Sequence, residues 1–293
     1  CRIIVLCADN GVCDEGVSCT PQSVTLSQTI NLTRGMTGAS SLAKHFGDEI
    51  VVVDVGVMTD YNCPAVINRK IAYGTKNLYL EPAMTREEAE KAICVGLEMA
   101  DKCAEDGVNA IGVGEMGIGN TTTSSAVAAA LLGCDVAEVT GRGAGLSDDK
   151  LIHKQQVIAE AIEKYELRKA EPLQILRTVG GFDIAGLAGV CIGGALYHIP
   201  IVLDGVISMV AALVAERIVP GTKAYLIPSH KGKEPAVKKL MEALEMEPVI
   251  DGKLALGEGT GAVMMLSLIE MALHIYQDRT TFSDIQIEQY KRY

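Results

Sequence analysis

The sequence predicts an α/β protein built on a parallel β-sheet with helices on both faces. Short β-branched runs alternate with longer helical segments along the 293 residues. The predicted strands are apolar throughout, which is typical of parallel strands buried on both faces. Ligands of such sheets bind outside the carboxyl ends of the strands. We therefore expect chemically important motifs where predicted strands end.

The predicted elements follow one another along the whole chain. The strands cover residues 2–8, 50–57, 109–114, 200–203 and 224–227. The helices cover residues 23–46, 85–106, 122–132, 148–166, 172–180, 183–197, 206–216, 234–244 and 259–277. No linker or internal repeat interrupts them, so we expect one main α/β domain over residues 1–293.

Composition and charge exclude several classes of protein. The net charge of -11 argues against a nucleic-acid partner. No apolar run reaches 18 residues, which argues against a membrane span. The nine cysteines contain no C-x-x-C pair, so we expect reduced thiols, a cytoplasmic location and no metal site. The chain begins at Cys1 inside an apolar run, so we expect the natural N-terminus upstream.

The clearest motif is Gly-Glu-Met-Gly-Ile-Gly-Asn-Thr-Thr at residues 114–122. It follows a predicted strand and precedes a helix of small residues that ends at Gly133. Glycines let backbone N–H groups approach an anion, and Asn120 or Thr121 can cap the helix. A phosphate cradle and an unliganded turn explain the pattern equally well. The motif is not a Walker loop, because no Gly-Lys-Ser/Thr follows it.

A second glycine-rich segment, residues 139–146, precedes a helix that carries Lys154. A loop, a helix start and a lysine one to two turns later can bind a sugar phosphate. Taken alone, this segment is explained better by a surface helix with a solvated lysine.

The third motif, residues 254–262, places Glu258 between two glycines and close to Leu256. A carboxylate near apolar surface has a raised pKa and becomes a better base near neutral pH. A charged turn residue explains the pattern equally well.

Other polar groups carry weaker signals. The turn at residues 9–12, the segment 16–22 and Gln28 can line a pocket, but caps and turns explain them equally well. The same holds for residues 229–231. No Ser/His/Asp set has nucleophile-elbow spacing. We interpret four histidines as structural, namely His45, His153, His198 and His274.

Together these segments resemble the nicotinate-nucleotide–dimethylbenzimidazole phosphoribosyltransferase family of cobamide lower-ligand assembly. The resemblance covers nearly the whole chain in one order. Its most specific strings are residues 114–122 and Leu-Gly-Glu-Gly-Thr-Gly at residues 256–261. The other matching segments are residues 15–18, 33–35, 53–56, 82–85, 141–146 and 203–205.

The resemblance implies a fold and an activity. It implies a Rossmann-like sheet and a smaller helical domain built from the chain ends, to which residues 1–30 and 260–293 contribute. It implies transfer of the 5-phosphoribosyl group from nicotinate mononucleotide to an aromatic acceptor, with release of nicotinate. The product is an α-riboside phosphate for cobamide lower-ligand synthesis. No metal or organic cofactor is expected. The chain is expected to form a homodimer or a heterodimer.

The resemblance also implies roles for single residues. Glu258 matches the catalytic base, and Glu115 falls where a carboxylate would offset positive charge on the ribose. The expected substrate-binding residues are Gly117, Gly119, Asn120, Thr121, Thr122, Gly143, Lys154, Thr20, Gln28 and Leu256. Of these, Thr20, Gln28 and Leu256 are expected at the acceptor.

Two departures leave the acceptor open. The family usually has histidine at the position of Asn10 and more often serine at that of Thr20. Both positions are expected near the acceptor end, so benzimidazole, purine and phenol remain candidates. One alternative function is a non-catalytic or partner-dependent subunit of a heteromeric transferase, against which Glu258 argues. Another is an enzyme that uses a nucleoside triphosphate, against which the missing Walker lysine argues.

Overall fold

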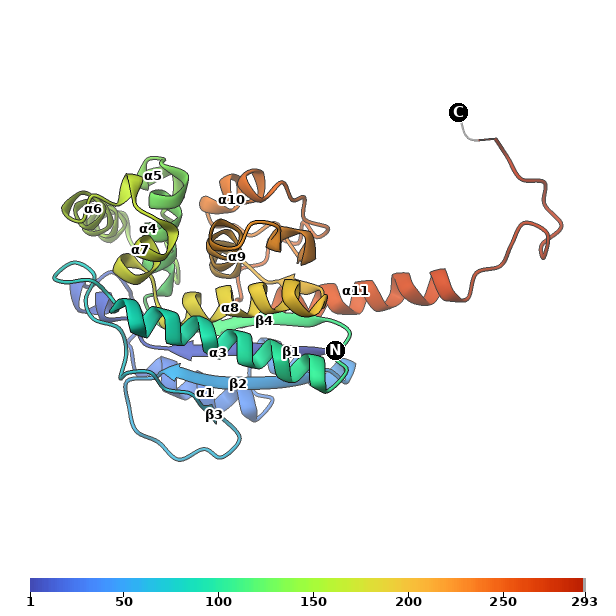
Figure 1. Cartoon of the computed structure of the whole chain (residues 1–293), viewed down its shortest axis with the longest axis horizontal. Helices are drawn as coiled ribbons and strands as arrows, with labels where there is room; N and C mark the ends of the chain where they lie inside the picture. Colours follow the sequence, from blue (N-terminus) through green and yellow to red (C-terminus); the bar gives the residue numbers. More distant parts are fainter. Residues whose placement is uncertain (292–293) are drawn as a thin grey trace.

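The computed structural model describes residues 1–291, and its sheet confirms the predicted fold class (Figure 1). The strands are β1 (Arg2–Ala8), β2 (Glu49–Gly56), β3 (Ile67–Asn68), β4 (Ile111–Met116), β5 (Ile201–Leu203) and β6 (Leu226–Pro228). They lie in the order β3-β2-β1-β4-β5-β6, and every neighbouring pair is parallel. This is the strand order of the Rossmann fold, in which ligands bind where the order reverses. Here the order reverses between β1 and β4.

Helices cover both faces of the sheet because successive residues of β1 point to opposite sides. Ile3 and Val5 share a core with α1 (Val24–Thr33), α2 (Gly38–Phe46) and the first half of α11 (Thr260–Gln277). Ile4 and Leu6 belong to a larger core with the remaining helices. These are α3 (Arg86–Glu105), α4 (Asn120–Leu132), α5 (Val136–Val139), α6 (Asp148–Lys164), α7 (Pro172–Val179), α8 (Phe182–Tyr197), α9 (Val206–Ile218) and α10 (Ala236–Leu244).

Glycines bring α3 and α8 into direct backbone contact. A Cβ on Gly96 would lie 1.9 Å from the carbonyl oxygen of Gly186, and one on Gly189 would lie 2.0 Å from that of Ile93. Any larger residue at either position would force the helices apart. This packing fixes the N-terminus of α8, and with it Asp183, relative to the sheet.

The predicted single helix over residues 23–46 is wrong. α1 ends at Thr33, and Gly35 takes the left-handed conformation with φ 71°. α2 then begins with a capping box, in which Thr37 Oγ1 accepts from the Ser40 N–H at 3.3 Å and Ser40 Oγ accepts from the Thr37 N–H at 3.1 Å. The break turns the N-terminus of α2 towards the loop before α11, which matters for the site below.

Other boundaries differ by a few residues. The strand predicted at 109–114 is β4, which extends to Met116 and so includes Glu115. The strand predicted at 224–227 is a 3-10 turn followed by β6. The N-cap of α4 is Gly119, without a side-chain cap, so neither Asn120 nor Thr121 caps the helix as predicted. The short elements β3 and α5 were not predicted.

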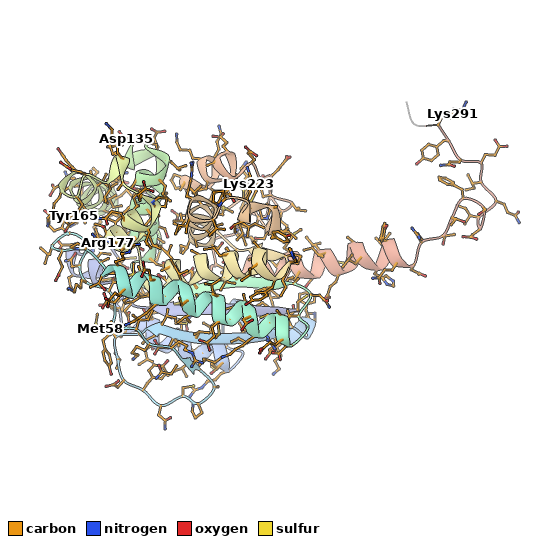
Figure 2. All side chains as sticks on the ribbon, viewed as in Figure 1. Met58, Asp135, Tyr165, Arg177, Lys223 and Lys291 are labelled. Carbon is orange, nitrogen blue, oxygen red and sulfur yellow. The ribbon has the colours of Figure 1, made fainter. Side chains whose placement is uncertain are left out.

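The C-terminal part of the chain leaves the sheet. α11 is buried up to Ser267, then projects from the body and continues into an extended segment that reaches Lys291 (Figure 2). A separate small helical domain from the chain ends stays a prediction, and residues 292–293 of that range lie outside the described residues. No helix within residues 1–291 is long and apolar enough to cross a membrane.

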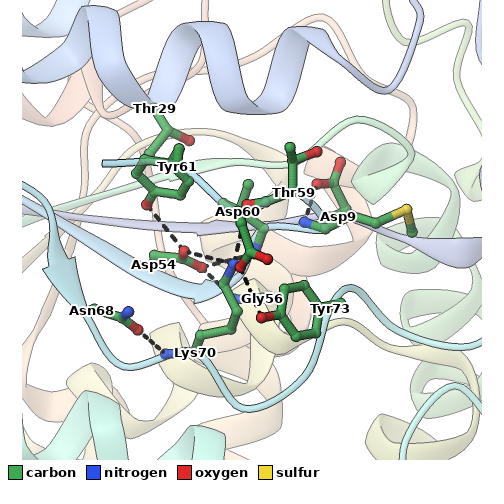
Figure 3. A network of polar contacts seen from close by, with 12 residues as sticks. Asp9, Thr29, Asp54, Gly56, Thr59, Asp60, Tyr61, Asn68, Lys70 and Tyr73 are labelled. Carbon is green, nitrogen blue, oxygen red and sulfur yellow. Dashed lines mark hydrogen bonds and ion pairs between the residues drawn. The ribbon is translucent and has the colours of Figure 1, made fainter. Parts of the chain in front are cut away.

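A polar network holds the loop after β2 against the sheet (Figure 3). Buried Asp54 accepts hydrogen bonds from the N–H groups of residues 56 and 57 at 3.0 and 2.8 Å, and from the Tyr61 hydroxyl at 3.0 Å. Lys70 Nζ lies 3.5 Å from Asp54 Oδ2 and 4.4 Å from the centre of the Tyr73 ring. The loop is therefore anchored by a buried charge and its partners.

Candidate active site

A cavity of about 290 Å³ lies at the carboxyl ends of β4, β5 and β6. Four segments supply most of its lining: residues 114–121, 204–208, 230–237 and 254–258. Two further loops add Ser18, Thr20, Gly143 and Ala144. Its volume is close to the lower end of the range for small-molecule sites.

Glu115, at the end of β4, forms one wall of the cavity and is 8% exposed. Asn120 Nδ2 donates a hydrogen bond to Glu115 Oε2 and a second, at 3.0 Å, to Asp183 Oδ2. Burial raises the pKa of Glu115 to about 8, and the Asp183 carboxyl adds to this effect. Burial therefore favours the protonated form of the Glu115 carboxyl near neutral pH.

The glycine-rich turn after β4 brings the N-terminus of α4 to the cavity. Gly117 passes so close to β1 that a Cβ there would lie 2.4 Å from the carbonyl oxygen of Ala8. Free N–H groups at a helix N-terminus bind anions well. Four predicted substrate-binding residues of this turn line the cavity: Gly117, Gly119, Asn120 and Thr121. Thr122 does not, because its side chain is buried in the core.

Lys154 is fully buried, at 0% exposure, so the interpretation as a solvated lysine is wrong. Its Nζ donates to Thr121 Oγ1 at 2.9 Å and to the Gly141 carbonyl at 3.2 Å. Burial lowers its pKa to about 8, and the nearby Glu234 carboxylate opposes this shift. The lysine lies behind Thr121 and not in the cavity wall. From there it adds positive charge beside the N-terminus of α4.

Glu258 also lines the cavity and lies in a strained loop. Its φ is 64°, between Gly257 at 74° and Gly259 at 93°, and it is 9% exposed. A non-glycine residue in this region is uncommon, and such strain clusters at functional sites. The loop rests directly on β4, since a Cβ on Gly114 would lie 2.4 Å from the carbonyl oxygen of Glu258.

The Glu258 carboxylate is held by groups from α1 and α2. Gln28 Nε2 donates to its Oε1 at 3.2 Å. Burial raises the pKa of Glu258, while the Thr37 hydroxyl and the N–H groups of Gly38 and Ala39 act in the opposite direction. A helix N-terminus favours the anion in the same way. Gln28 thus contacts the Glu258 carboxylate and is absent from the cavity lining among the described residues, and its expected place at the acceptor stays a prediction.

Asp204, after β5, fastens the Glu258 loop and was not predicted as a site residue. Its buried carboxylate accepts from the N–H groups of Gly259 at 3.1 Å and Gly261 at 2.7 Å. His230 also lines the cavity, with its Nδ1 2.9 Å from Ser229 Oγ. The position of Asp204 at a strand end is the signal that could have identified it.

Of the remaining residues that the sequence singled out, three line the cavity and Asn10 does not. Thr20, Gly143 and Leu256 line the cavity, and Leu256 is 68% exposed at its rim. Asn10 does not lie near an acceptor position in this cavity. It is buried behind the glycine-rich turn, where its Nδ2 donates to the Ile118 carbonyl at 3.3 Å. The departure at Asn10 therefore affects the support of the turn.

These features define the molecule as an α/β enzyme whose cavity lies at the N-terminus of α4, a place where anions bind well. Two carboxyl groups, Glu115 on β4 and Glu258 on the loop before α11, line the same cavity. The N-terminus of α2 offsets part of the effect of burial on Glu258, and the Asn120 amide holds Glu115. Such a pair can manage a proton and a developing positive charge beside a bound phosphate.

Comparison with known proteins identifies the family. Residues 1–287 match the family described as Phosphoribosyltransferase. The nicotinate-nucleotide–dimethylbenzimidazole phosphoribosyltransferase of Ruminiclostridium cellulolyticum is 50% identical over 99% of this chain and 82% of its own. The enzyme of the same name from Clostridium acetobutylicum is 48% identical over the same shares.

A solved structure agrees with these sequences. The crystal structure of CobT from Thermus thermophilus matches 99% of this chain and 86% of its own, with a TM-score of 0.93 and 37% identity. The chain belongs to the nicotinate-nucleotide–dimethylbenzimidazole phosphoribosyltransferase family, and it is a glycosyltransferase. The resemblance found in the sequence is thereby confirmed.

Proposed function

We propose that the chain transfers the 5-phosphoribosyl group of nicotinate mononucleotide to an aromatic acceptor. The acceptor is dimethylbenzimidazole or a related base or phenol. The products are nicotinate and an α-riboside phosphate for cobamide lower-ligand synthesis. The observation that carries this proposal is that Glu115 and Glu258 face one cavity beside the N-terminus of α4.

The phosphate serves as the handle of the donor. The backbone N–H groups of Gly119 and Thr121, which have no hydrogen-bond partner among the described residues, bind it, and the buried charge of Lys154 strengthens that site through Thr121. Binding the phosphate there fixes the ribose against the far wall of the cavity. Orientation of two bound substrates in this way supplies a large part of the rate gain.

Glu258 acts as the base. The acceptor's lone pair attacks C1′ of the ribose while the C1′–N bond to the pyridinium breaks, and the electron pair of that bond neutralises the leaving nicotinate ring. The acceptor N–H or O–H proton passes to Glu258. Attack on the face opposite the leaving group converts the β-nucleotide to an α-linked product.

Glu115 stabilises the positive charge that develops on the ribose. A carboxylate does this well in a cavity from which water is excluded. Because burial favours the protonated form of Glu115, the role requires ionisation when the positively charged pyridinium ring of the donor binds beside it.

The test is nicotinate release by the purified chain from nicotinate mononucleotide, with dimethylbenzimidazole, adenine, phenol and p-cresol offered singly. We expect release that depends on one acceptor, which then names the substrate. Donor binding without release for any acceptor would overturn the proposal and favour a partner-dependent subunit. The dimeric state stays a prediction, which sedimentation of the same sample measures.

A further inference from the structure

Asp183 is a buried acid that the reaction, as proposed, does not use. It lies at the start of α8, is 0% exposed, and is absent from the cavity lining within the described residues. Its Oδ1 accepts the N–H of Ile184 at 2.9 Å, and its Oδ2 accepts the Asn120 amide at 3.0 Å. A buried carboxyl with so few hydrogen-bond donors lowers the stability of the fold. Its presence here therefore calls for a functional explanation.

The Asn120 amide joins this acid to the cavity. One nitrogen, Nδ2, donates to Asp183 Oδ2 and to Glu115 Oε2, so its two hydrogens are divided between two carboxyls. Glu115 Oε1 is left on the cavity side, where a Cβ on Gly257 would lie 3.5 Å from it. The orientation of Glu115 therefore depends on the amide, and the orientation of the amide depends on Asp183.

Two carboxyls that share one donor in a buried site do not both ionise easily, because the negative charges repel and burial disfavours each. The other charged groups acting on Glu115 make this worse, since Asp204 and Glu258 are acids too. Asp9 acts on Asp183 in the same sense. Burial raises the pKa of both Asp183 and Glu115, so the pair as a whole favours keeping a proton at neutral pH.

We propose that Asp183 is a positioning residue that acts through Asn120 to aim Glu115 at the donor and to keep one proton on the Glu115–Asp183 pair until the donor binds. Binding of the pyridinium ring brings a positive charge to Glu115, which then releases that proton to solvent. The donor thus creates the carboxylate that stabilises it. This inference rests on the proposed role of Glu115 and deepens it.

The packing around Asp183 agrees with a fixed position. A Cβ on Gly181 would lie 2.5 Å from Asp183 Oδ1 and 2.6 Å from Asn10 Oδ1, so the two oxygens face the same point. Asn10 Oδ1 is buried and has no hydrogen-bond partner among the described residues. The α3–α8 contact described above prevents the helix start from moving away.

The experiment follows the protonation of Glu115 directly, by ¹³C NMR of carboxyl-labelled protein between pH 5 and pH 10. Glu115→Gln identifies the signal. Asp183→Asn removes a like charge, so its Glu115 titration is expected to shift to lower pH. Asn120→Ser removes the shared donor, so its titration is expected to shift to higher pH. Cys191→Ala, buried on α8 away from the cavity, is the matched control and is expected to titrate as wild type.

Two functional readouts accompany the titration. The limb of kcat/KM that rises with pH reports the free enzyme, and it is expected to move with the NMR titration in each variant. Calorimetry of nicotinate mononucleotide binding at pH 7, in two buffers of different ionisation enthalpy, is expected to show release of close to one proton from wild type and clearly less from Asp183→Asn. A purely structural role for Asp183 would move neither readout.

An unchanged Glu115 titration in both Asp183→Asn and Asn120→Ser would overturn this inference. It would leave the proposed function intact if wild type still releases nicotinate. Opposite shifts in the two variants support the inference, and because they come from NMR they hold even where no acceptor is turned over. If Asp183→Asn fails to fold, Asp183→Ser, which also removes the carboxylate, takes its place and is expected to shift the Glu115 titration to lower pH.

Discussion

The two walls of the cavity are built differently. The donor wall is one contiguous stretch, residues 114–121, that runs from β4 into α4, and its acid is buried among other acids. The base wall is a strained loop that Gln28, the N-terminus of α2 and Asp204 hold from three separate parts of the chain. Burial raises the pKa of both acids, but only in the base wall does the N-terminus of α2 oppose that rise.

The largest effect is expected at the base wall. Glu258→Gln removes the proton acceptor while keeping the size of the side chain, so kcat should fall about 10²- to 10⁴-fold. Donor affinity, measured by calorimetry, should change less than about threefold. The control Glu270→Gln, an exposed carboxylate on α11, should retain wild-type rates. A wild-type kcat in Glu258→Gln would exclude this residue as the base.

At the donor wall, Lys154→Met should weaken donor binding. Loss of a charged contribution to the phosphate site corresponds to roughly a ten- to hundredfold rise in the donor Kd. Nicotinate riboside, which has no phosphate, should bind wild type and variant equally. The control Lys150→Met changes an exposed lysine of the same helix. Equal losses for nucleotide and riboside would show that Lys154 supports the fold only.

Stability against pH also separates the walls. Because the folded-state pKa of Glu115 is raised to about 8, its protonation stabilises the fold fully below the unfolded pKa near 4.5, and this contribution is lost as pH rises through 8. Glutamine does not ionise, so Glu115→Gln does not lose this stability at high pH. Its free energy of unfolding should exceed wild type by roughly 1–3 kcal/mol at pH 9 and by much less at pH 5. Urea denaturation at both pH values measures this, and equal differences at the two would contradict it.

The smallest effect is expected from Thr37→Val. The Thr37 hydroxyl lowers the pKa of Glu258, so its loss should raise that pKa and reduce kcat/KM at pH 6 about two- to fivefold. The same change also removes a helix cap. Thr85→Val, which removes the equivalent capping-box threonine of α3, should lower stability by about 1 kcal/mol and leave the pH profile unchanged. If the pH profiles of kcat/KM were the same in the two variants, Thr37 would act only as a helix cap.

The difference between the walls also explains what could be predicted from sequence. The sheet and the glycine-rich turn lie in local patterns, so periodicity and glycine spacing located them, and the resemblance to the family then singled out Glu115 within the turn. Local patterns cannot predict the groups that hold Glu258, because Asp204 and the N-terminus of α2 are brought to it only by the tertiary fold.

Two further errors have the same origin. A short break at Gly35 was missed because the segments on either side are both helical. Lys154 looked solvated because its burial depends on contacts with Thr121 and Gly141, which precede it on another part of the chain. Nothing in the sequence singled out Asp183, because an isolated acid at the start of a helix is common.

The left-handed backbone at Glu258 has a consequence for engineering. Glycine adopts φ 64° without strain, so Glu258→Gly should be more stable than Glu258→Ala by about 1 kcal/mol. A library selected for heat resistance alone would therefore enrich glycine at this codon and discard the base. Selection schemes for this enzyme need to couple survival to product formation.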